Sequence, residues 1–326
     1  MYIIFIFIIG GIFALGLGAE MIVRSSTNLA NIYKVSGYFI GFTLVALGTS
    51  LPELASTVQA LQTVNSIGIA FGNIIGSNVA NILLILGVIS IINPINFPNN
   101  DKQKNQTLVV LIITLVIALI YYFILQINFF NITFIGLFLI LLLIIFLFWQ
   151  YRIESAMSSE IISTYNYSHL ISYLILIIGL VFLYFGSKYF IIGSKMLAEY
   201  FNISDAIVGL TLVAFGTSLP ELSTGIVAAL RKQSNLAVGT ILGSNIYNIV
   251  GIFAIILLMR PHNLQIFSAT LILNFNIMVL VTFIFVYKIR IGIGILNIKP
   301  FHLGKKSGII FLFFYIIYIF YNYINM

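Results

Sequence analysis

The fold is decided by a stretch that occurs twice, as GFTLVALGTSLPEL at Gly41–Leu54 and as GLTLVAFGTSLPEL at Gly209–Leu222. Twelve of the fourteen positions are identical, at an offset of 168 residues. Further on, GNIIGSNVANI at Gly72–Ile82 matches GTILGSNIYNI at Gly239–Ile249 at seven of eleven positions. This self-similarity indicates two copies of one structural unit. Residues at equivalent positions of the two copies are called repeat mates below.

The composition is that of a membrane protein. Of the 326 residues, 61% are hydrophobic and 7% are charged, against about 25% charged residues in an ordinary soluble domain. A spanning helix needs about 20 mostly apolar residues. Cysteine is absent, which excludes disulfides and thiolate metal sites. We expect an all-α integral membrane protein with ten transmembrane helices, near residues 2–23, 36–62, 67–92, 106–126, 130–149, 169–198, 204–230, 235–259, 264–287 and 308–324.

The offset between the copies spans five predicted helices. Because five is an odd number, the second copy must enter the membrane upside down relative to the first. Two inverted five-helix repeats are a common plan of secondary transporters, which hold their substrate near the bilayer midplane where the repeats meet. We place the first repeat at residues 1–149, a short cytoplasmic linker at 150–168 and the second repeat at 169–326.

The net charge of +7 is interpreted as a topology signal, because the cations fall between the apolar runs. With the N-terminus outside, twelve Lys and Arg residues lie on the cytoplasmic side and three on the outer side. This bias follows the positive-inside rule. It predicts a multi-pass protein of the cell membrane with both termini on the outer side. Residues 1–9 carry no positive charge, so a signal peptide is not expected there.

Two acidic residues, Glu53 and Glu221, are repeat mates, and each lies midway along an apolar stretch. Insertion of a carboxylate at that depth costs about 3 kcal/mol. No Lys or Arg lies at a similar depth, so an internal ion pair is not expected. Each carboxylate could instead be stabilised by a bound cation, by hydrogen bonds from hydroxyl groups or by a proton. A protonated glutamate would hold neighbouring helices together through hydrogen bonds. Glu20 has Lys188 as its repeat mate, and we interpret it as an interfacial residue.

Oxygen-bearing residues surround both glutamates. Thr49 and Ser50 precede Glu53 by four and three residues, so all three can share one helix face. The second copy repeats this arrangement with Thr217, Ser218 and Glu221. A proline just before each glutamate, Pro52 and Pro220, removes a backbone donor. We expect the carbonyls near Ala46 and Ala214 to be freed and to point at an ion.

The next helix of each copy adds a polar stripe, which consists of Asn73, Ser77 and Asn81 in the first copy and of Thr240, Ser244 and Asn248 in the second. Carboxylate, hydroxyl, amide and carbonyl oxygens are the ligands of hard cations such as Ca²⁺ and Na⁺. The histidines lie at helix ends or in loops, so a Zn²⁺ or Cu⁺ site is not expected. For Asn78 and Asn245, ordinary small-residue helix packing is as good an interpretation as a ligand role.

With these motifs, the chain resembles prokaryotic sodium/calcium exchangers of the cation/calcium antiporter superfamily. The resemblance covers nearly the whole chain, and the paired GTSLPEL and GSN motifs are highly specific. It implies electrogenic exchange of about three Na⁺ for one Ca²⁺ by a transporter of inverted repeats. Helices 1 and 6 resemble the pair that slides across the core. The implied ion ligands are Glu53, Thr49, Ser77, Asn81 and the Ala46 carbonyl, with Glu221, Thr217, Ser244, Asn248 and the Ala214 carbonyl.

Some members, including K⁺-dependent ones, carry Asp where this chain has Asn248. The site therefore has two formal negative charges, which one Ca²⁺ neutralises. With three Na⁺ bound, the site would carry a net charge of +1. This balance is typical of K⁺-independent exchange.

The sequence thus predicts a secondary antiporter that exchanges Na⁺ for Ca²⁺ by alternating access. The alternative is a proton/calcium antiporter of the same superfamily, although those relatives usually carry a Gly-Asn-Ala-x-Glu motif. An intramembrane hydrolase using Ser50 or Ser218 would need a base, and no His, Lys or Asp lies at matching depth. A passive channel would lack saturable counter-transport. No enzyme activity, cofactor, nucleic acid or protein partner is expected, and we expect a monomer.

Overall fold

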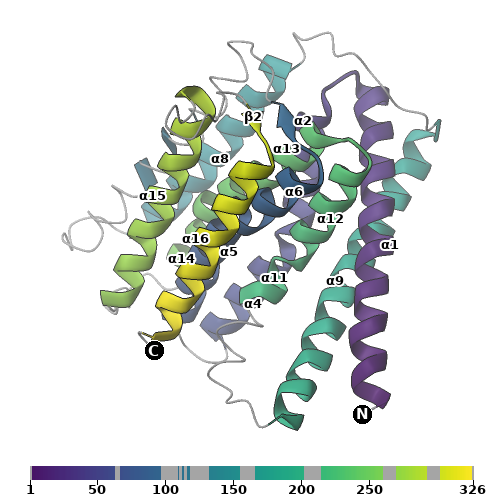
Figure 1. The fold of residues 1–326 in the computed structure, drawn as a ribbon. Coiled ribbons are helices and arrows are strands. Elements are labelled where there is room, and N and C mark those ends of the chain that lie inside the picture. Colours follow the sequence, from purple (N-terminus) through teal and green to yellow (C-terminus); the bar gives the residue numbers. More distant parts are fainter. Residues whose placement is uncertain are drawn as a thin grey trace.

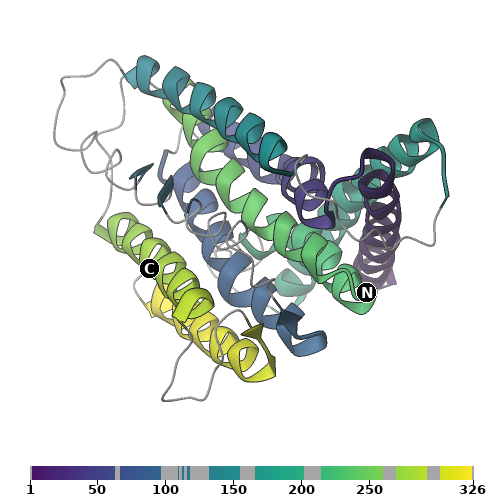
Figure 2. The same cartoon turned by 90° about the horizontal axis from the view of Figure 1, so that it is seen from above.

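The computed structural model describes residues 2–62, 67–96, 109, 112–113, 116–117, 132–154, 166–201, 214–259, 269–291 and 302–324. Within these residues the chain is a helical bundle, seen from the side in Figure 1 and from above in Figure 2. Eight of the described helices are long and apolar enough to span a membrane. The all-α membrane class is therefore confirmed. The helix expected at 106–126 and the first half of the helix expected at 204–230 lie largely outside the described residues.

Five long helices surround the polar centre of the bundle: α1 (Tyr2–Tyr33), α8 (Ile132–Glu154), α9 (His169–Tyr200), α15 (Ala269–Ile291) and α16 (Lys305–Ile324). The first of them is longer than expected. The sequence predicts a helix that ends near residue 23, but two hydroxyls beyond it bond within the helix: Ser25 donates to the Ile22 carbonyl and Thr27 to the Val23 carbonyl. Such bonds give these buried hydroxyls a partner inside the helix, which continues to Tyr33.

The remaining helices are broken into shorter elements. In the first repeat they are α2 (Gly37–Ile40), the π-helical η1 (Gly41–Val45), α3 (Ala46–Thr49), α4 (Leu51–Gln62), α5 (Ile67–Ala80), η2 (Asn81–Ile85) and α6 (Leu86–Ile92). In the second they are α11 (Ala214–Thr217), α12 (Leu219–Leu230), α13 (Ser234–Ile246), η4 (Tyr247–Ile252) and α14 (Phe253–Met259). The predicted spans at 36–62 and 67–92 are confirmed, with candidate spans at Gly37–Gln62 and Gly68–Ile92. The breaks at Ser50 and Ser218 lie beside Pro52 and Pro220, where the sequence predicts a distortion.

Helices α1 and α9 are repeat mates and pack side by side in opposite directions (Figures 1 and 2). A Cβ atom added to Gly18 would lie 2.7 Å from the Gly179 carbonyl oxygen, and one added to Gly11 would lie 2.8 Å from the Gly186 carbonyl oxygen. Gly11 and Gly18 have Gly179 and Gly186 as their repeat mates, so the same glycines meet in a reciprocal pattern. The two copies are therefore inverted, and glycine allows their first helices to touch through the backbone.

A small antiparallel sheet of two strands, each of two residues, accompanies the helices. Strand β1 (Ile95–Asn96) pairs with β2 (His302–Leu303), so that Ile95 faces Leu303. Lys288, which is 1% exposed at the end of α15, donates to the His302 carbonyl. The sheet thus joins the segment after α6 to the segment before α16. Both ends of the chain lie at the same end of the bundle (Figure 1).

Candidate ion-binding site

Glu53 and Glu221 lie at matched positions in the first turns of α4 and α12, and both are 0% exposed. Each of these helices begins directly after a break. The residues at the breaks, Ser50 and Ser218, have nearly the same backbone angles, with φ near −82° and −87° and ψ near 0° and 3°. A helix N-terminus favours negative charge because its first N–H groups are unpaired. The broken helices therefore offer a favourable place for a buried carboxylate.

The expectation of a freed carbonyl at Ala46 is wrong. The Ala46 carbonyl accepts the Ser50 N–H at 3.0 Å and the Thr49 hydroxyl at 3.4 Å. A proline has no N–H to donate to the carbonyl four residues before it. That carbonyl belongs to Gly48 for Pro52 and to Gly216 for Pro220. The Gly216 carbonyl accepts the Ser187 hydroxyl of α9 at 2.6 Å. Ala214 begins α11, and the role of its carbonyl stays a prediction.

Each glutamate accepts a hydrogen bond from the serine of the GSN segment in its own repeat. Ser77 donates to Glu53 Oε1 at 3.3 Å, and Ser244 donates to Glu221 Oε1 at 3.2 Å. The two carboxylates are close enough to interact electrostatically. Thr49 and Ser50 face Glu221 from the opposite repeat. The predicted carboxylates, serines and threonine thus converge on one buried centre.

The two repeats are also joined by reciprocal bonds between polar side chains. Ser50 and Ser244 share a hydrogen bond of 2.8 Å, and their repeat mates Ser218 and Ser77 share one of 3.2 Å. The asparagine pairs obey the same symmetry. Asn81 Nδ2 donates to Ser244 Oγ at 3.3 Å and to Asn245 Oδ1 at 2.9 Å.

The opposite half of the asparagine arrangement is nearly identical. Asn248 Nδ2 donates to Ser77 Oγ at 3.2 Å and to Asn78 Oδ1 at 3.3 Å. Asn78 and Asn245 therefore act as cross-repeat acceptors that orient Asn248 and Asn81. These bonds are contacts between the repeats, and whether Asn78 and Asn245 also bind an ion is not decided by them.

Four acceptor oxygens in this cluster are buried and have no hydrogen-bond partner among the described residues. They are Glu53 Oε2, Glu221 Oε2, Asn81 Oδ1 and Asn248 Oδ1. They form two pairs of repeat mates, so both halves of the cluster are incomplete in the same way. A buried acceptor without a partner is costly. Oxygen atoms of carboxylates and amides are the ligands that hard cations take.

Both polar stripes contain a π-helical turn. Asn81 begins η2, and Asn248 is the second residue of η4. A π-turn inserts one extra residue into an α-helix and re-aims the side chains around it, and such turns are frequent at functional sites. The spacing of four residues in the polar stripes did not predict these π-turns. The residues around the stripes are hydrophobic on every face of the helix, so no shift of an apolar face marks the extra residue.

Glu20 lies outside this cluster and is paired, as an interfacial residue would be. It accepts from Arg24 at 2.6 Å within α1, and from Arg231 at the end of α12. The side chains of Glu20 and Arg231 are 23% and 48% exposed. The pair links α1 to α12 near the surface of the bundle.

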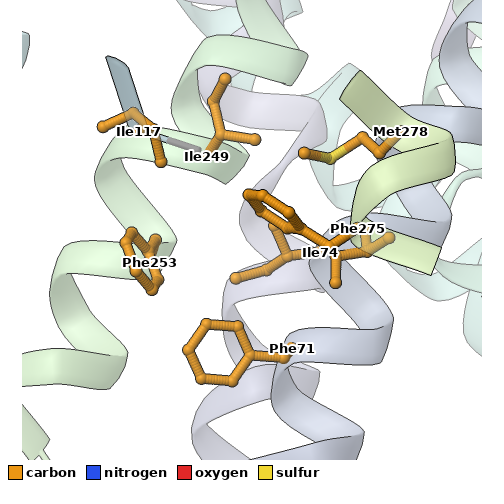
Figure 3. A pocket seen from close by; sticks show the side chains of 8 residues that line it. Phe71, Ile74, Ile117, Ile249, Phe253, Phe275 and Met278 are labelled. Atoms are coloured by element: carbon orange, nitrogen blue, oxygen red, sulfur yellow. The ribbon is translucent and has the colours of Figure 1, made fainter. Parts of the chain in front are cut away.

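A pocket beside α5 can be excluded as the ion site. Figure 3 shows that its lining is made of apolar side chains from α5, η4, α14 and α15, among them Phe71, Ile249, Phe253 and Met278. It offers no oxygen ligand. The oxygen-bearing side chains that could bind a cation lie instead in the polar centre between the two repeats.

Comparison with known proteins agrees with the repeats and with the chemistry of the polar centre. The family described as sodium/calcium exchanger protein matches residues 3–152 and 171–324. The chain is 38% identical to the uncharacterized membrane protein MJ0091 of Methanocaldococcus jannaschii over 75% of this chain and 80% of that protein. It is 28% identical to the sodium/calcium exchanger MaX1 of Methanosarcina acetivorans, over 79% of this chain and 83% of that protein.

The fold is also similar to a solved structure of the sodium-calcium exchanger NCX_Mj, soaked with zero Na⁺ and Ca²⁺. The TM-score is 0.80 at 32% identity, and the match covers 97% of this chain and 98% of that one. Eight described helices can span a membrane, and the family match extends over almost all of the sequence. The chain is therefore a multi-pass membrane protein that belongs to the sodium/calcium exchanger family of the cation/calcium antiporter superfamily.

Proposed function

We propose that this protein exchanges Na⁺ for Ca²⁺ across the cell membrane, and that both ions use the centre around Glu53 and Glu221. The observation that carries the proposal is the set of four buried acceptor oxygens, in two pairs of repeat mates, that lack a partner among the described residues. Two carboxylates and two amides suit a hard cation. NCX_Mj, whose fold is similar, is named as a sodium-calcium exchanger.

The charge of the centre explains why Na⁺ and Ca²⁺ would bind in turn. Two carboxylates give two formal negative charges, and the described residues place no Lys or Arg in an ion pair with either of them. One Ca²⁺ neutralises this charge. An empty centre keeps two unpaired negative charges, which are costly to bury, whereas a filled centre carries less net charge and can move. Coupling follows because only filled sites can move.

Alternating access is supported by a difference between repeat mates. Leu219 on α12 is 5% exposed, whereas its mate Leu51 on α4 is 49% exposed. On the covered side, α12 packs against α1, and Glu20 binds Arg231 across that contact. The two mated positions beside the centre are therefore covered unequally. Sliding of the α1/α9 pair along its glycine seam would reverse this arrangement, as inverted repeats allow.

The orientation proposed for the protein follows from its charges. Arg24 and Arg231 lie at the α1–α12 contact, so the positive-inside rule makes that side cytoplasmic. Both termini would then be outside, and the more exposed Leu51 side would face outward. We expect a monomer, because each chain contains both halves of the centre.

Proteoliposomes provide the test of this function. Vesicles loaded with Na⁺ and diluted into Na⁺-free buffer should take up radiolabelled Ca²⁺, because the outward Na⁺ gradient drives exchange. Uptake should vanish when K⁺ replaces internal Na⁺. It should also saturate with Ca²⁺, which a passive channel would not show.

A proton/calcium antiporter would behave differently in the same vesicles. A pH gradient without Na⁺ would drive uptake, because a buried carboxylate can carry a proton in place of a cation. Full uptake under that condition, together with indifference to Na⁺, would refute Na⁺ coupling.

A further inference from the structure

Asn73 on α5 makes contacts that span both repeats, one helical turn before Ser77. Its Nδ2 lies 3.2 Å from the Glu53 carbonyl oxygen and 2.8 Å from Ser56 Oγ, both on α4. It also lies 3.2 Å from Thr57 Oγ1. On its other side, Asn73 Oδ1 accepts the hydroxyl of Thr217 at 3.3 Å. One carboxamide thus connects the segment of the first carboxylate to the TS motif of the second repeat.

The repeat mate of Asn73 does not make this connection. Thr240 is 0% exposed, and its hydroxyl donates to the Leu236 carbonyl of its own helix at 2.9 Å. The rest of the centre is symmetric, as the paired serine and asparagine bonds show. The bridge through Asn73 is therefore a departure from the repeat symmetry, on the side of the centre formed by α4 and α5.

The bridge contributes to the orientation of the Thr217 hydroxyl. A hydroxyl can ligate a cation only through an oxygen lone pair, so its proton must point elsewhere. Asn73 Oδ1 takes that proton. The mated hydroxyl of Thr49 instead donates to the Ala46 carbonyl within its own helix, at 3.4 Å.

We propose that Asn73 is a positioning residue for Na⁺ binding, which acts through Thr217 by accepting its proton and holding its lone pair toward the ion. The inference rests on the proposed function, because it takes Thr217 as a ligand. Neutral hydroxyl oxygens suit a monovalent ion, whereas the carboxylates carry most of the attraction for Ca²⁺. Loss of Asn73 should therefore weaken Na⁺ binding more than Ca²⁺ binding.

The test measures the Na⁺ concentration for half-maximal exchange in proteoliposomes. Residues that orient a metal ligand typically contribute 10- to 100-fold in affinity, so we expect Asn73→Ala to raise this concentration by about tenfold. The Ca²⁺ concentration for half-maximal uptake should change by much less. Thr217→Val should have a similar effect, and the double variant should be no worse than Thr217→Val alone, because residues that act through one another are not additive.

A matched control is Asn274→Ala. Asn274 Nδ2 donates to Asn322 Oδ1 at 2.6 Å between α15 and α16, so this change also removes a partly buried carboxamide contact, but away from the centre. Its half-maximal Na⁺ concentration should equal that of the wild type. Additive effects of Asn73→Ala and Thr217→Val, equal losses for Na⁺ and Ca²⁺, or no loss would each overturn the inference. Failure of the wild type to couple Ca²⁺ to Na⁺ would instead refute the proposed function.

Discussion

Replacing Glu53 by Gln is expected to reduce Na⁺-driven Ca²⁺ uptake by at least about 100-fold, since a residue that only orients a ligand already contributes 10- to 100-fold. Glu221→Gln should have the same effect, because the two carboxylates are repeat mates with matched serine bonds. Gln keeps the shape of Glu and removes its charge. The centre would then lose one of the two carboxylates that attract Ca²⁺, so Ca²⁺ binding should weaken.

A suitable control is Glu199→Gln, because Glu199 is an exposed acid near the end of α9. It should exchange at the wild-type rate. Both centre variants should purify as folded protein, since a buried amide of the same size replaces each carboxylate. If either variant kept more than half of the wild-type rate with an unchanged Ca²⁺ dependence, its glutamate would not be an ion ligand.

The second large effect is expected from Asn248→Asp, which should move the voltage dependence from the Na⁺ step to the Ca²⁺ step. With two carboxylates, the Ca²⁺-filled centre is neutral, and the centre filled with three Na⁺ carries one positive charge. A third carboxylate at 248 makes the Na⁺-filled centre neutral and leaves one negative charge with Ca²⁺. One charge moved across 100 mV changes the free energy by about 2.3 kcal/mol, so the shift is measurable.

Ca²⁺/Ca²⁺ exchange and Na⁺/Na⁺ exchange should be measured at imposed K⁺ diffusion potentials, at a pH high enough to ionise the new Asp. In the wild type only Na⁺/Na⁺ exchange should depend on the potential, and in Asn248→Asp only Ca²⁺/Ca²⁺ exchange should. Asn81→Asp should behave likewise, because Asn81 and Asn248 are repeat mates. Asn248→Ala serves as the neutral control. If Ca²⁺/Ca²⁺ exchange by Asn248→Asp did not depend on the membrane potential, this charge count would be contradicted.

The global plan of the molecule was predictable from the sequence because it depends on local signals. Apolar runs of membrane length indicated helices, and an odd number of helices between GTSLPEL copies indicated inversion. The reciprocal contacts of Gly11 and Gly18 in α1 with Gly186 and Gly179 in α9 agree with that prediction. Glu53 and Glu221 stood out because a carboxylate in an apolar run needs a physical reason.

The details of the centre depended on tertiary contacts, which the sequence does not encode locally. The bridge from Asn73 to Thr217 joins residues 144 positions apart. The pairing of Asn81 with Asn245 likewise appears only once the repeats are packed. The ligand set as a whole remains a prediction.

The central claim is that one centre, between Glu53 and Glu221, binds either Ca²⁺ or Na⁺. X-ray diffraction from crystals soaked in Sr²⁺, which scatters anomalously and stands in for Ca²⁺, tests it most directly. The account predicts an anomalous peak between the two carboxylates, within ligand distance of both, that disappears when the same crystals are soaked in high Na⁺. A Sr²⁺ peak elsewhere in the protein, or one between the glutamates that Na⁺ leaves unchanged, would contradict it.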